Sequence, residues 1–537
     1  MASCFPDPMD QTETIAFLTR LAGAPPVETH ISYVFLGLDT VWKLKKAVLL
    51  PFLDFRAVTD RHRFCLRELA LNAPHAEELY RDVAPVTRGA DGALTLGGSG
   101  EAVDWVVRMA RVPDGDFLDV RAARGGLDVA MLDRVADTVA AFHLTLPPVT
   151  GAGPDMAGIA AGNLASALSA GLPEAAARAW HDRMMPGLAA LAPWVAHRAK
   201  DGFVRRCHGD LHLGNLCLWH GAPVPFDALE FDEALAEIDT GYDLAFLLMD
   251  LEHRLDSAAA NRVMNRYVAR TGDADLTRGL PVFMSMRAMV RAHVAARTGH
   301  AMVRAHVAAR TGHAMVRAHV AARTGGAFAD YLAAAADYLA PVPGVVIAIG
   351  GLQGTGKSSL ARALAPALGR APGALVARGD EIRKRQNGVA PEQRLPPAAY
   401  TSSQGAAVFA ELAAMVETAA RGGHAVIADA MFMDPAHRRA VEAAARRAGM
   451  NFVGLWLTAP AAMLERRVAA RIGDASDATV AVLRAAAPRD PGAGTWRALD
   501  ASASVADLAA EVMTIDSVGL AKRPRLNVLG ETSGPDL

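Results

Sequence analysis

Cysteine is scarce in this chain: only four of its 537 residues are cysteines. Their spacing fits neither a disulfide framework nor a zinc site, so we expect a reducing, cytoplasmic environment. Long apolar runs are missing too, since no stretch reaches the about 18 apolar residues of a membrane-spanning helix, and the first ten residues lack a signal-peptide pattern. We therefore expect no membrane partner. The cysteines are Cys4, Cys65, Cys207 and Cys217.

An excess of one charge is missing as well. The 55 basic and 57 acidic residues give a net charge of −2, which supplies no electrostatic reason to bind nucleic acid or an anionic membrane. Only seven basic residues are lysines, and four of these lie in the segment VWKLKK (residues 41–46) and at Lys357. A specific need for lysine at these positions would explain this distribution, and a genome-wide preference for arginine over lysine is the alternative explanation. Apolar residues make up 52% of the chain, so we expect a folded protein of two or three domains.

The first 340 residues mix strands and helices. The segment HISYVFLGLDTVWKLKKAVLL (residues 30–50) is typical of a β-hairpin with its turn at residues 37–39. Helices precede and follow it, and a strand-loop-strand unit interrupts a later helical region. The predicted ranges are 11–22 and 60–72 for the first two helices, 127–200 for a mostly helical stretch, 203–232 for the strand-loop-strand unit, and further helix to about residue 325.

A second pattern begins after the short linker PVPGVV at residues 341–346. The segments VVIAIG, ALVARGD, HAVIADA and FVGLWLT predict strands, and Ala-rich helices alternate with them. This alternation indicates a parallel sheet with helices on both faces. We therefore predict a mixed α/β and α+β protein with an N-terminal domain at residues 1–340, a C-terminal domain at residues 341–515 and a loose tail at residues 516–537.

One internal repeat is present. The 13-residue segment AMVRAHVAARTGH starts at residue 288 and occurs three times up to residue 326, with Gly326 in place of the last histidine. Near-identical copies indicate a recent tandem duplication and not a solenoid. Each copy ends in Thr-Gly, a helix-ending signal, and we predict a helical but poorly packed protrusion. His293, His306 and His319 are 13 residues apart, which favours surface or groove histidines over metal ligands.

The residues from Gly351 to Ser358 read GLQGTGKS. A predicted strand precedes this segment and a predicted helix follows it, which is the setting of a phosphate-binding loop. The backbone N–H groups of such a loop surround phosphates, Lys357 contacts the β- and γ-phosphate oxygens, and Ser358 offers a hydroxyl to Mg²⁺. The predicted ATP-contacting residues are Gly351, Gly354, Thr355, Gly356, Lys357, Ser358 and Ser359.

Charged residues follow the next two predicted strands. Asp380 and Arg383 form a D-x-x-R motif at a strand end, where an open α/β sheet binds its ligands. The carboxylate could accept a hydroxyl proton while the guanidinium pairs with an anion, although a helix cap with a surface ion pair is the alternative. Asp429 ends the third strand and suits Mg²⁺, or else a simple cap. Arg466 and Arg471 predict a phosphate-covering lid, with a solvated basic face as the alternative.

The N-terminal half holds a second pattern. Residues 208–215 read HGDLHLGN, and the spacing of Asp210 and Asn215 is that of a protein-kinase catalytic loop. Asp210 would accept or orient a hydroxyl proton, and Asn215 and the later Asp227 would hold a metal ion. Lys43 on the predicted hairpin would contact the nucleotide phosphates and pair with Glu68. Lys45 points to the same side of the strand and remains open as an alternative, as does Glu77 for Glu68.

These motifs resemble known families. GLQGTGKS, RGDEIRK and VIADAMF resemble small P-loop kinases that phosphorylate free hydroxyls. HGDLHLGN, Asp227 and IDTGYDLAFLLMDLE resemble the aminoglycoside-phosphotransferase-like branch of the kinase fold, in which Asp243 is implied to be structural. Their order resembles a bacterial fusion family in which such a domain precedes an AAA_33-like P-loop domain. The chain departs from the pattern before Lys43, where no glycine-rich loop occurs, and after Asp227, where Ala-Leu-Glu replaces Phe-Gly.

The resemblance implies an ATP- and Mg²⁺-dependent phosphotransferase with two nucleotide-type domains, acting on a hydroxyl of a small molecule and not on nucleic acid. The alternative is an ATP-binding regulatory protein whose N-terminal kinase-like domain is catalytically weak. A motor-type ATPase is less consistent with the D-x-x-R motif. Neither the acceptor molecule nor the oligomeric state follows from the residues.

Overall fold

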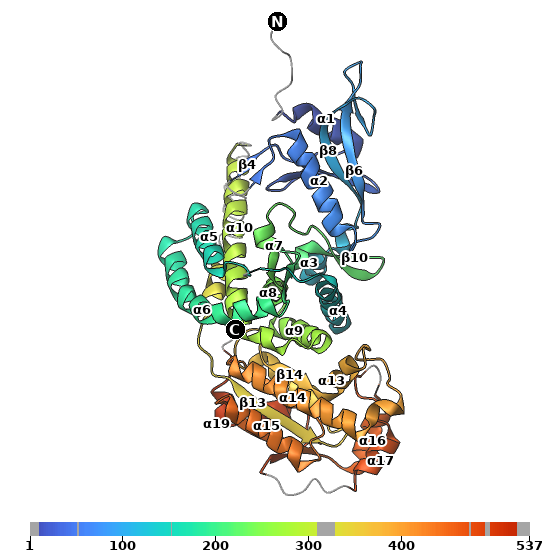
Figure 1. Cartoon of the computed structure of the whole chain (residues 1–537), viewed down its shortest axis with the longest axis vertical. Coiled ribbons are helices and arrows are strands. Elements are labelled where there is room, and N and C mark those ends of the chain that lie inside the picture. Colours follow the sequence, from blue (N-terminus) through green and yellow to red (C-terminus); the bar gives the residue numbers. More distant parts are fainter. Residues whose placement is uncertain are drawn as a thin grey trace, which may run out of the picture. The chain divides into compact units, whose positions relative to one another are not determined.

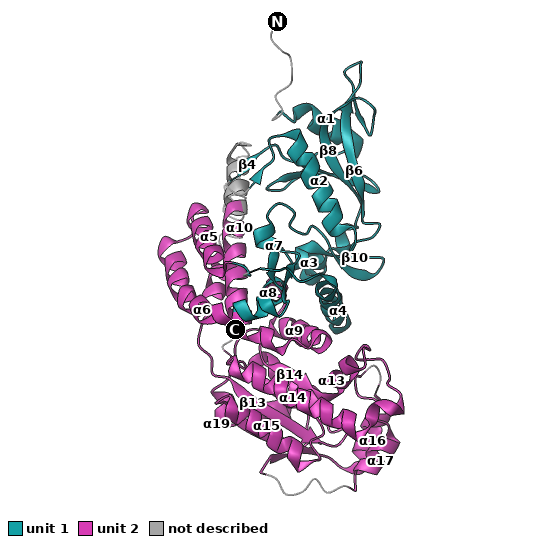
Figure 2. Cartoon of the chain, in the orientation of Figure 1, with its two compact units in different colours: residues 1–154, 195–243 teal, residues 155–194, 244–537 magenta. Residues whose placement is uncertain are grey.

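The computed structural model describes residues 10–50, 53–151, 153–308, 328–471, 474–488 and 495–523, with side chains omitted from residue 298 to residue 308. The chain divides into two compact units, which Figure 2 colours separately. Unit 1 comprises residues 1–154 and 195–243, and unit 2 comprises residues 155–194 and 244–537. Within the described residues, no helix has the length and apolar character needed to cross a membrane.

Unit 1 is built on a six-stranded antiparallel sheet with the order β1-β2-β3-β8-β6-β7. Figure 1 shows α2 beside the strands β6 and β8 of this sheet. The predicted hairpin forms β2 and β3, with Val34 opposite Lys43, and the two predicted helices form α1 and α2. Strands β6 to β8 were missed by the sequence analysis. The bounds are α1 Thr12–Ala22, β1 Val27–Glu28, β2 Ser32–Leu36, β3 Thr40–Lys45, β4 Leu49–Leu50, β5 Leu53–Asp54, α2 Val58–Asn72, β6 Tyr80–Arg88, β7 Leu94–Leu96 and β8 Glu101–Ala110.

Short strands and a loop complete unit 1. The hairpin β10–β11 and the pair β9–β12 enclose the segment HGDLHLGN, as expected for a strand-loop-strand unit. Asp128 is the N-cap of the helix α4, and its carboxylate accepts a hydrogen bond from Met131 N. The bounds are α3 Leu118–Ala123, α4 Val129–Thr145, β9 Val204–Arg206, β10 Leu216–Trp219, β11 Ala222–Pro225, α7 Glu233–Ala236 and β12 Glu237–Asp239. The helices α6 Glu174–Lys200 and α8 Thr240–Arg254 belong to both units.

Unit 2 contains a five-stranded parallel sheet with the order β14-β15-β13-β16-β17. The central strand β13 is buried along its whole length, which explains its continuous apolar run. Four strands were predicted, and β17 was missed. The bounds are β13 Val345–Gly351, α12 Lys357–Leu364, β14 Leu375–Arg378, α13 Gly379–Gln386, α14 Ser402–Arg421, β15 Val426–Asp429, α15 Pro435–Arg447, β16 Asn451–Thr458, α16 Ala461–Ala469, α17 Val480–Ala486, β17 Arg497–Asp500, α18 Val505–Met513 and α19 Asp516–Gly519.

Helices from the first half of the chain also belong to unit 2. They are α5 Met156–Ser169, α9 Ser257–Thr271 and α10 Leu280–Ala308. The helix α9 covers the edge strand β14: Asn265 Oδ1 accepts a hydrogen bond from Val376 N at 2.6 Å, and the Asn261 side-chain amide donates to Ala374 O at 3.0 Å. Two asparagines thus satisfy backbone groups that an edge strand leaves unpaired.

Two predictions for this region need correction. The helix α10 continues through Thr298 and Gly299 to Ala308, so the expected helix end in the first repeat copy is wrong. That copy is also packed, because Ala288, Met289 and Ala292 are fully buried and this burial holds the helix together across a weak local stop signal. The backbone of the second copy is described only as far as Ala308, and the rest of that copy, the side chain of His306 and the third copy with His319 lie outside the described residues.

The start of the predicted tail is also ordered. The helix α19 falls inside it, and Val518 and Ala521 are buried in the core of the parallel sheet. Residues 524–537 lie outside the described residues. The predicted domain boundary at residues 340 and 341 remains a prediction, since the division into units follows spatial contacts and places helices from both sides of that boundary in unit 2.

Candidate active sites

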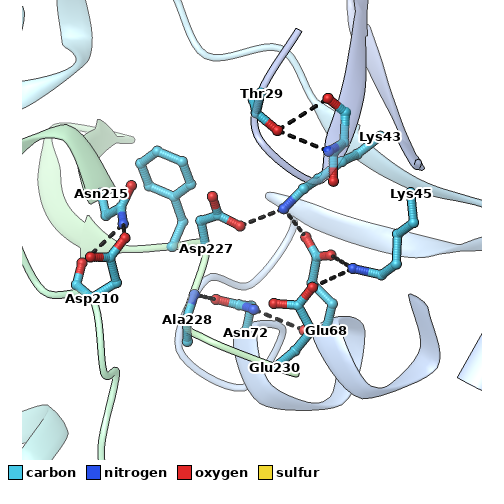
Figure 3. Close-up of polar contacts among 12 residues, drawn as sticks. Thr29, Lys43, Lys45, Glu68, Asn72, Asp210, Asn215, Asp227, Ala228 and Glu230 are labelled. Carbon is cyan, nitrogen blue, oxygen red and sulfur yellow. Dashed lines mark hydrogen bonds and ion pairs between the residues drawn. The ribbon is translucent and has the colours of Figure 1, made fainter. Parts of the chain in front are cut away.

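The site in unit 1 centres on two lysines of β3. Lys43 Nζ lies 2.8 Å from Glu68 Oε1, the partner predicted from the kinase pattern. It also contacts Asp227 Oδ1, which the sequence analysis did not predict. Lys45 Nζ lies 2.8 Å from Glu68 Oε2 and contacts Glu230. Figure 3 shows Glu68 between the two lysines. Lys45 has no exposed side-chain surface, which favours Lys43 as the residue that can reach a nucleotide.

The charges in this cluster stabilise one another. Burial alone would raise the pKa of Glu68, but the Lys43 and Lys45 ammonium groups lower it to about 2. Burial acts to lower the pKa of Lys43, and its carboxylate neighbours reverse this effect and raise it. The lysines therefore remain protonated and Glu68 ionised, which is the state a phosphate-binding lysine needs. The backbone carbonyl of Glu77, the alternative partner, accepts a hydrogen bond from Trp219 Nε1 at 3.1 Å.

The residues predicted to form a catalytic loop lie together. The Asn215 amide donates to Asp210 O and Asp210 Oδ2, both at 2.9 Å, so Asn215 orients the carboxylate of Asp210, which is 42% exposed. His212 Nε2 lies 3.5 Å from Asp210 Oδ2, a contact that the sequence analysis did not predict. Gly209 has a φ of +83°, and a Cβ there would lie 3.1 Å from Leu229 Cβ, so glycine is required before Asp210.

Asp243 supports this loop from α8. Its carboxylate accepts hydrogen bonds from His208 N at 3.1 Å and Gly209 N at 2.9 Å. His143 Nε2 lies 3.1 Å from the same carboxylate, and Asp243 is fully buried. These contacts agree with the structural role that the resemblance implied.

The site in unit 2 is the phosphate loop at the carboxyl end of β13. Gly351 and Gly354 have φ values of +136° and +86°, and a Cβ on them would lie 2.5 Å from Leu457 O and 2.8 Å from Leu464 O respectively. Only glycine fits these two positions. Thr355 Oγ1 donates to Leu352 O at 2.9 Å and is buried.

Residues at the end of the loop start the helix α12. Gly356 is its N-cap, with a φ of +87°, and Ser359 is exposed in its first turn. Lys357 Nζ donates to Gly351 O at 2.9 Å. Ser358 Oγ donates to Asp429 Oδ2 at 2.5 Å, so the two predicted magnesium ligands of this site lie together. The helix start presents backbone N–H groups, which favour anions.

Electrostatic interactions connect Lys357 to the strand ends. Burial lowers the pKa of the Lys357 ammonium, and the carboxylates of Asp429 and Asp380 act against this decrease. Burial raises the pKa of Asp380 itself, and the neighbouring Arg378 opposes that increase. Asp380 and Asp429 therefore share the electrostatic environment of Lys357, as expected for groups at one edge of a parallel sheet.

The predicted arginines are placed differently from one another. Arg383 donates to Ala399 O at 2.9 Å, and its guanidinium lies 4.9 Å from the centre of the Tyr400 ring. Arg471 follows α16, lies 3.8 Å from Asp474 through its Nε, and is close enough to Lys357 to lower the pKa of that lysine further. Arg466 is exposed on α16, so its phosphate contact remains a prediction.

Arg378 was missed by the sequence analysis. This buried guanidinium, at the end of β14, lies 3.5 Å from Asp429 and 3.5 Å from Glu381, and it also contacts Asp474. It thereby connects the Ser358–Asp429 pair with the loop after α16. The only sequence signal was its position at a strand end, two residues before the D-x-x-R motif.

The comparisons with known proteins agree with a P-loop domain in the second half. Residues 346–489 match the family model AAA_33, described as an AAA domain, which confirms the AAA_33-like part of the predicted fusion. The predicted α/β and α+β fold class is also confirmed, because a six-stranded antiparallel sheet precedes a five-stranded parallel sheet in the chain. An uncharacterised protein of Mycobacterium tuberculosis (strain ATCC 25618 / H37Rv) is 27% identical over 503 residues, covering 88% of this chain and 91% of that protein.

Solved structures are similar to parts of the chain. A choline/ethanolamine kinase family protein from Mesorhizobium loti is 13% identical with a TM-score of 0.32, covering 60% of this chain and 98% of that chain. A sugar kinase from Janibacter sp. HTCC2649 is 18% identical with a TM-score of 0.27, covering 34% and 99%. An aminoglycoside phosphotransferase from Alicyclobacillus acidocaldarius is 13% identical with a TM-score of 0.24, covering 63% and 97%.

Proposed function

We propose that this protein is an ATP-dependent phosphotransferase that moves the γ-phosphate of ATP to a hydroxyl of a small molecule, with a nucleotide site in each unit. The phosphate loop of unit 2 carries the proposal, because Lys357 begins α12 at the carboxyl end of β13 and Ser358 is bonded to Asp429. This arrangement of strand, glycines, lysine and hydroxyl suits the triphosphate of a nucleotide.

In unit 2, Asp380 is the candidate base. Burial raises the pKa of its carboxyl group, which brings it closer to the range in which a carboxylate accepts a proton efficiently. The acceptor oxygen forms a bond to the γ-phosphorus as the bond from that phosphorus to the β–γ bridging oxygen breaks, and ADP leaves. The hydroxyl proton passes to Asp380. Arg471 supplies positive charge beside Lys357.

In unit 1, the same chemistry falls to a different set of residues. Asp210 takes the hydroxyl proton, and the Asn215 amide holds its carboxylate in one orientation. Lys43 supplies positive charge to the nucleotide phosphates, while Glu68 holds its ammonium in place. This division of roles is that of a kinase site, in which positioning and charge stabilisation account for most of the catalysis.

The donor atoms of both sites suit magnesium, which prefers oxygen ligands. Ser358 and Asp429 would hold the ion in unit 2, and Asn215 and Asp227 would hold it in unit 1. The ion would neutralise charge on the phosphate oxygens. Asp227 is 41% exposed at its side chain, so its carboxylate is accessible. A net charge of −2 gives no reason to expect a nucleic-acid acceptor.

A second function has its own support. Lys43 is held by both Glu68 and Asp227, and the β2–β3 turn carries Gly37 alone where kinases have a glycine-rich loop. Both features favour a regulatory protein in which unit 1 binds ATP but transfers phosphate weakly, while unit 2 retains the phosphate loop.

Substitutions in each site distinguish these functions. The purified full-length protein is given labelled ATP and a metabolite mixture, and labelled products are separated. We expect Lys357→Ala to remove one labelled product and Asp210→Asn to reduce a second by about 10²- to 10⁴-fold, the contribution of a proton-transfer group. Lys200→Ala and Asp201→Asn, which change exposed residues of the same types, serve as matched controls.

The outcomes separate cleanly. A loss below about threefold for Asp210→Asn, far less than a proton-transfer group contributes, together with a complete loss for Lys357→Ala, supports the regulatory function. If neither variant changes phosphate transfer, or if the wild type takes up no ATP when magnesium is present, the proposed function is wrong.

A further inference from the structure

Lys45 and Glu230 form a second ion pair behind the lysine that would bind the nucleotide. Side chains two residues apart on a strand point to the same side, so Lys45 follows Lys43 toward α2. The two side chains of the pair have exposed fractions of 0% and 4%. Lys45 contacts Glu68 and Glu230 together, and these two glutamates come from segments more than 160 positions apart in the sequence.

The cluster around Lys43 and Lys45 has more carboxylates than ammonium groups. Two ammonium groups, on Lys43 and Lys45, face three carboxylates, on Glu68, Glu230 and Asp227. The two buried carboxylates match the two buried lysines, so the surplus negative charge belongs to the part-exposed Asp227. Without Lys45, the ammonium of Lys43 would be the only cation beside two buried carboxylates, which are costly when unpaired.

The segment from Asp227 to Glu230 is anchored at several points. Tyr80 Oη accepts a hydrogen bond from Asp227 N at 3.1 Å, and Asn72 Oδ1 accepts one from Ala228 N at 2.9 Å. Asp227 itself has a φ of +61°, a left-handed conformation that a non-glycine residue adopts only when its surroundings hold it there. The Lys45–Glu230 pair fixes the far end of the segment, as Figure 3 shows.

We propose that Lys45 and Glu230 are positioning residues of the unit 1 site. Their ion pair holds the segment 227–230 against β3 and α2 and balances the buried charge, so that Asp227 is free to exchange Lys43 for a divalent cation when nucleotide binds. This inference rests on the proposed function of unit 1. It assigns a role to the Ala-Leu-Glu sequence that stands where other kinases have Phe-Gly.

Nucleotide binding provides a test that does not depend on turnover. The full-length chain carries Lys357→Ala in every sample, so that uptake by unit 2 is weakened, and the Kd of a non-hydrolysable ATP analogue is measured by calorimetry with Mg²⁺ and with EDTA. We expect Lys45→Met to raise the Kd with Mg²⁺ by about 10- to 100-fold, as for partners that orient metal ligands. The Kd in EDTA should change little, because Lys43 and Glu68 remain.

Two further variants address folding and charge. Lys45→Met/Glu230→Gln removes one charge of each sign, so it should fold with a circular dichroism spectrum like that of the Lys357→Ala reference. It should still lack the Mg²⁺-dependent gain in affinity, meaning the decrease in Kd that the reference shows when Mg²⁺ replaces EDTA. Lys46→Met is the matched control, because this neighbouring lysine pairs with the exposed Glu28 outside the buried cluster. It should leave both Kd values unchanged.

Each failure has a separate meaning. If the Lys357→Ala reference binds no nucleotide, the unit 1 function fails and this inference fails with it. If the reference shows the Mg²⁺-dependent gain but Lys45→Met or the paired variant shows it equally, only the inference is wrong. If Lys46→Met raised the Kd as much as Lys45→Met, the inference would also be wrong, because the loss of any nearby positive charge would then explain the weaker binding.

Discussion

The carboxylate of Asp243 should determine how firmly the loop of Asp210 is held. It is fully buried and accepts hydrogen bonds from His208 N and Gly209 N, with His143 Nε2 3.1 Å away. The change Asp243→Asn keeps the shape but turns one oxygen into an N–H₂ group, which then faces a backbone donor. Losing one hydrogen bond to a charged group and leaving a buried N–H unpaired costs about 2–3 kcal/mol.

This loss should be local, so hydrogen exchange is a better measurement than global unfolding, because a chain of two units does not unfold in one step. A cost of about 2–3 kcal/mol raises the opening constant about 30- to 150-fold, since each 1.4 kcal/mol is tenfold. The amide of Gly209 should therefore exchange faster by about that factor in Asp243→Asn. Phosphate transfer that depends on Asp210 should fall as well.

An exposed ion pair of the same unit supplies the control. Asp82 pairs with Arg108 at the surface, and both side chains are more than a third exposed, so Asp82→Asn should change stability by less than about 1 kcal/mol. If Gly209 exchanged at the same rate in Asp243→Asn as in the wild type, the carboxylate would not hold the loop, and the structural role assigned to Asp243 would be wrong.

Two other predictions concern unit 2. Burial lowers the pKa of His424 to about 4, below the value of about 6.5 in an unfolded chain, so the stability that neutral His424 contributes is present above pH 6.5 and is lost toward pH 4, by up to about 3 kcal/mol. His424→Gln should therefore flatten the fall in Tm between these two pH values. An unchanged fall in Tm would contradict this prediction. Asn265→Ala leaves Val376 N without its acceptor and should lower stability by about 1–3 kcal/mol, measured by urea unfolding, whereas the exposed Asn387→Ala should not.

The sequence predicted which residues lie together in each candidate site, because their signals are local. Gly351 and Gly354 are needed by the backbone of the loop itself, and Lys357 follows at the start of the helix that the loop opens. The spacing of Asp210 and Asn215 is likewise short enough for the Asn215 amide to reach Asp210 directly. A pattern of this kind depends on neighbouring residues alone, and it can be recognised without knowledge of the fold.

Contacts between distant segments could not be predicted in this way. Glu230 is 185 positions from Lys45, and Asn265 is 111 positions from Val376, and nothing in the sequence near either residue indicates its partner. The end of the repeat helix was predicted wrongly for a related reason: the Thr-Gly signal at residues 298–299 is weak compared with the burial of the helix before it.

The sequence by itself therefore determined where the phosphate loop, the segment HGDLHLGN, the β2–β3 hairpin and four strands of the parallel sheet lie, since these depend on backbone geometry and on the periodicity of apolar residues. Only the tertiary structure decided that Lys43 is less deeply buried than Lys45, that Glu230 pairs with Lys45, and that Arg378 links Asp429 to Asp474. The physical reason is that burial and ion pairing are properties of the packed chain, in which segments far apart in the sequence exclude water from one another.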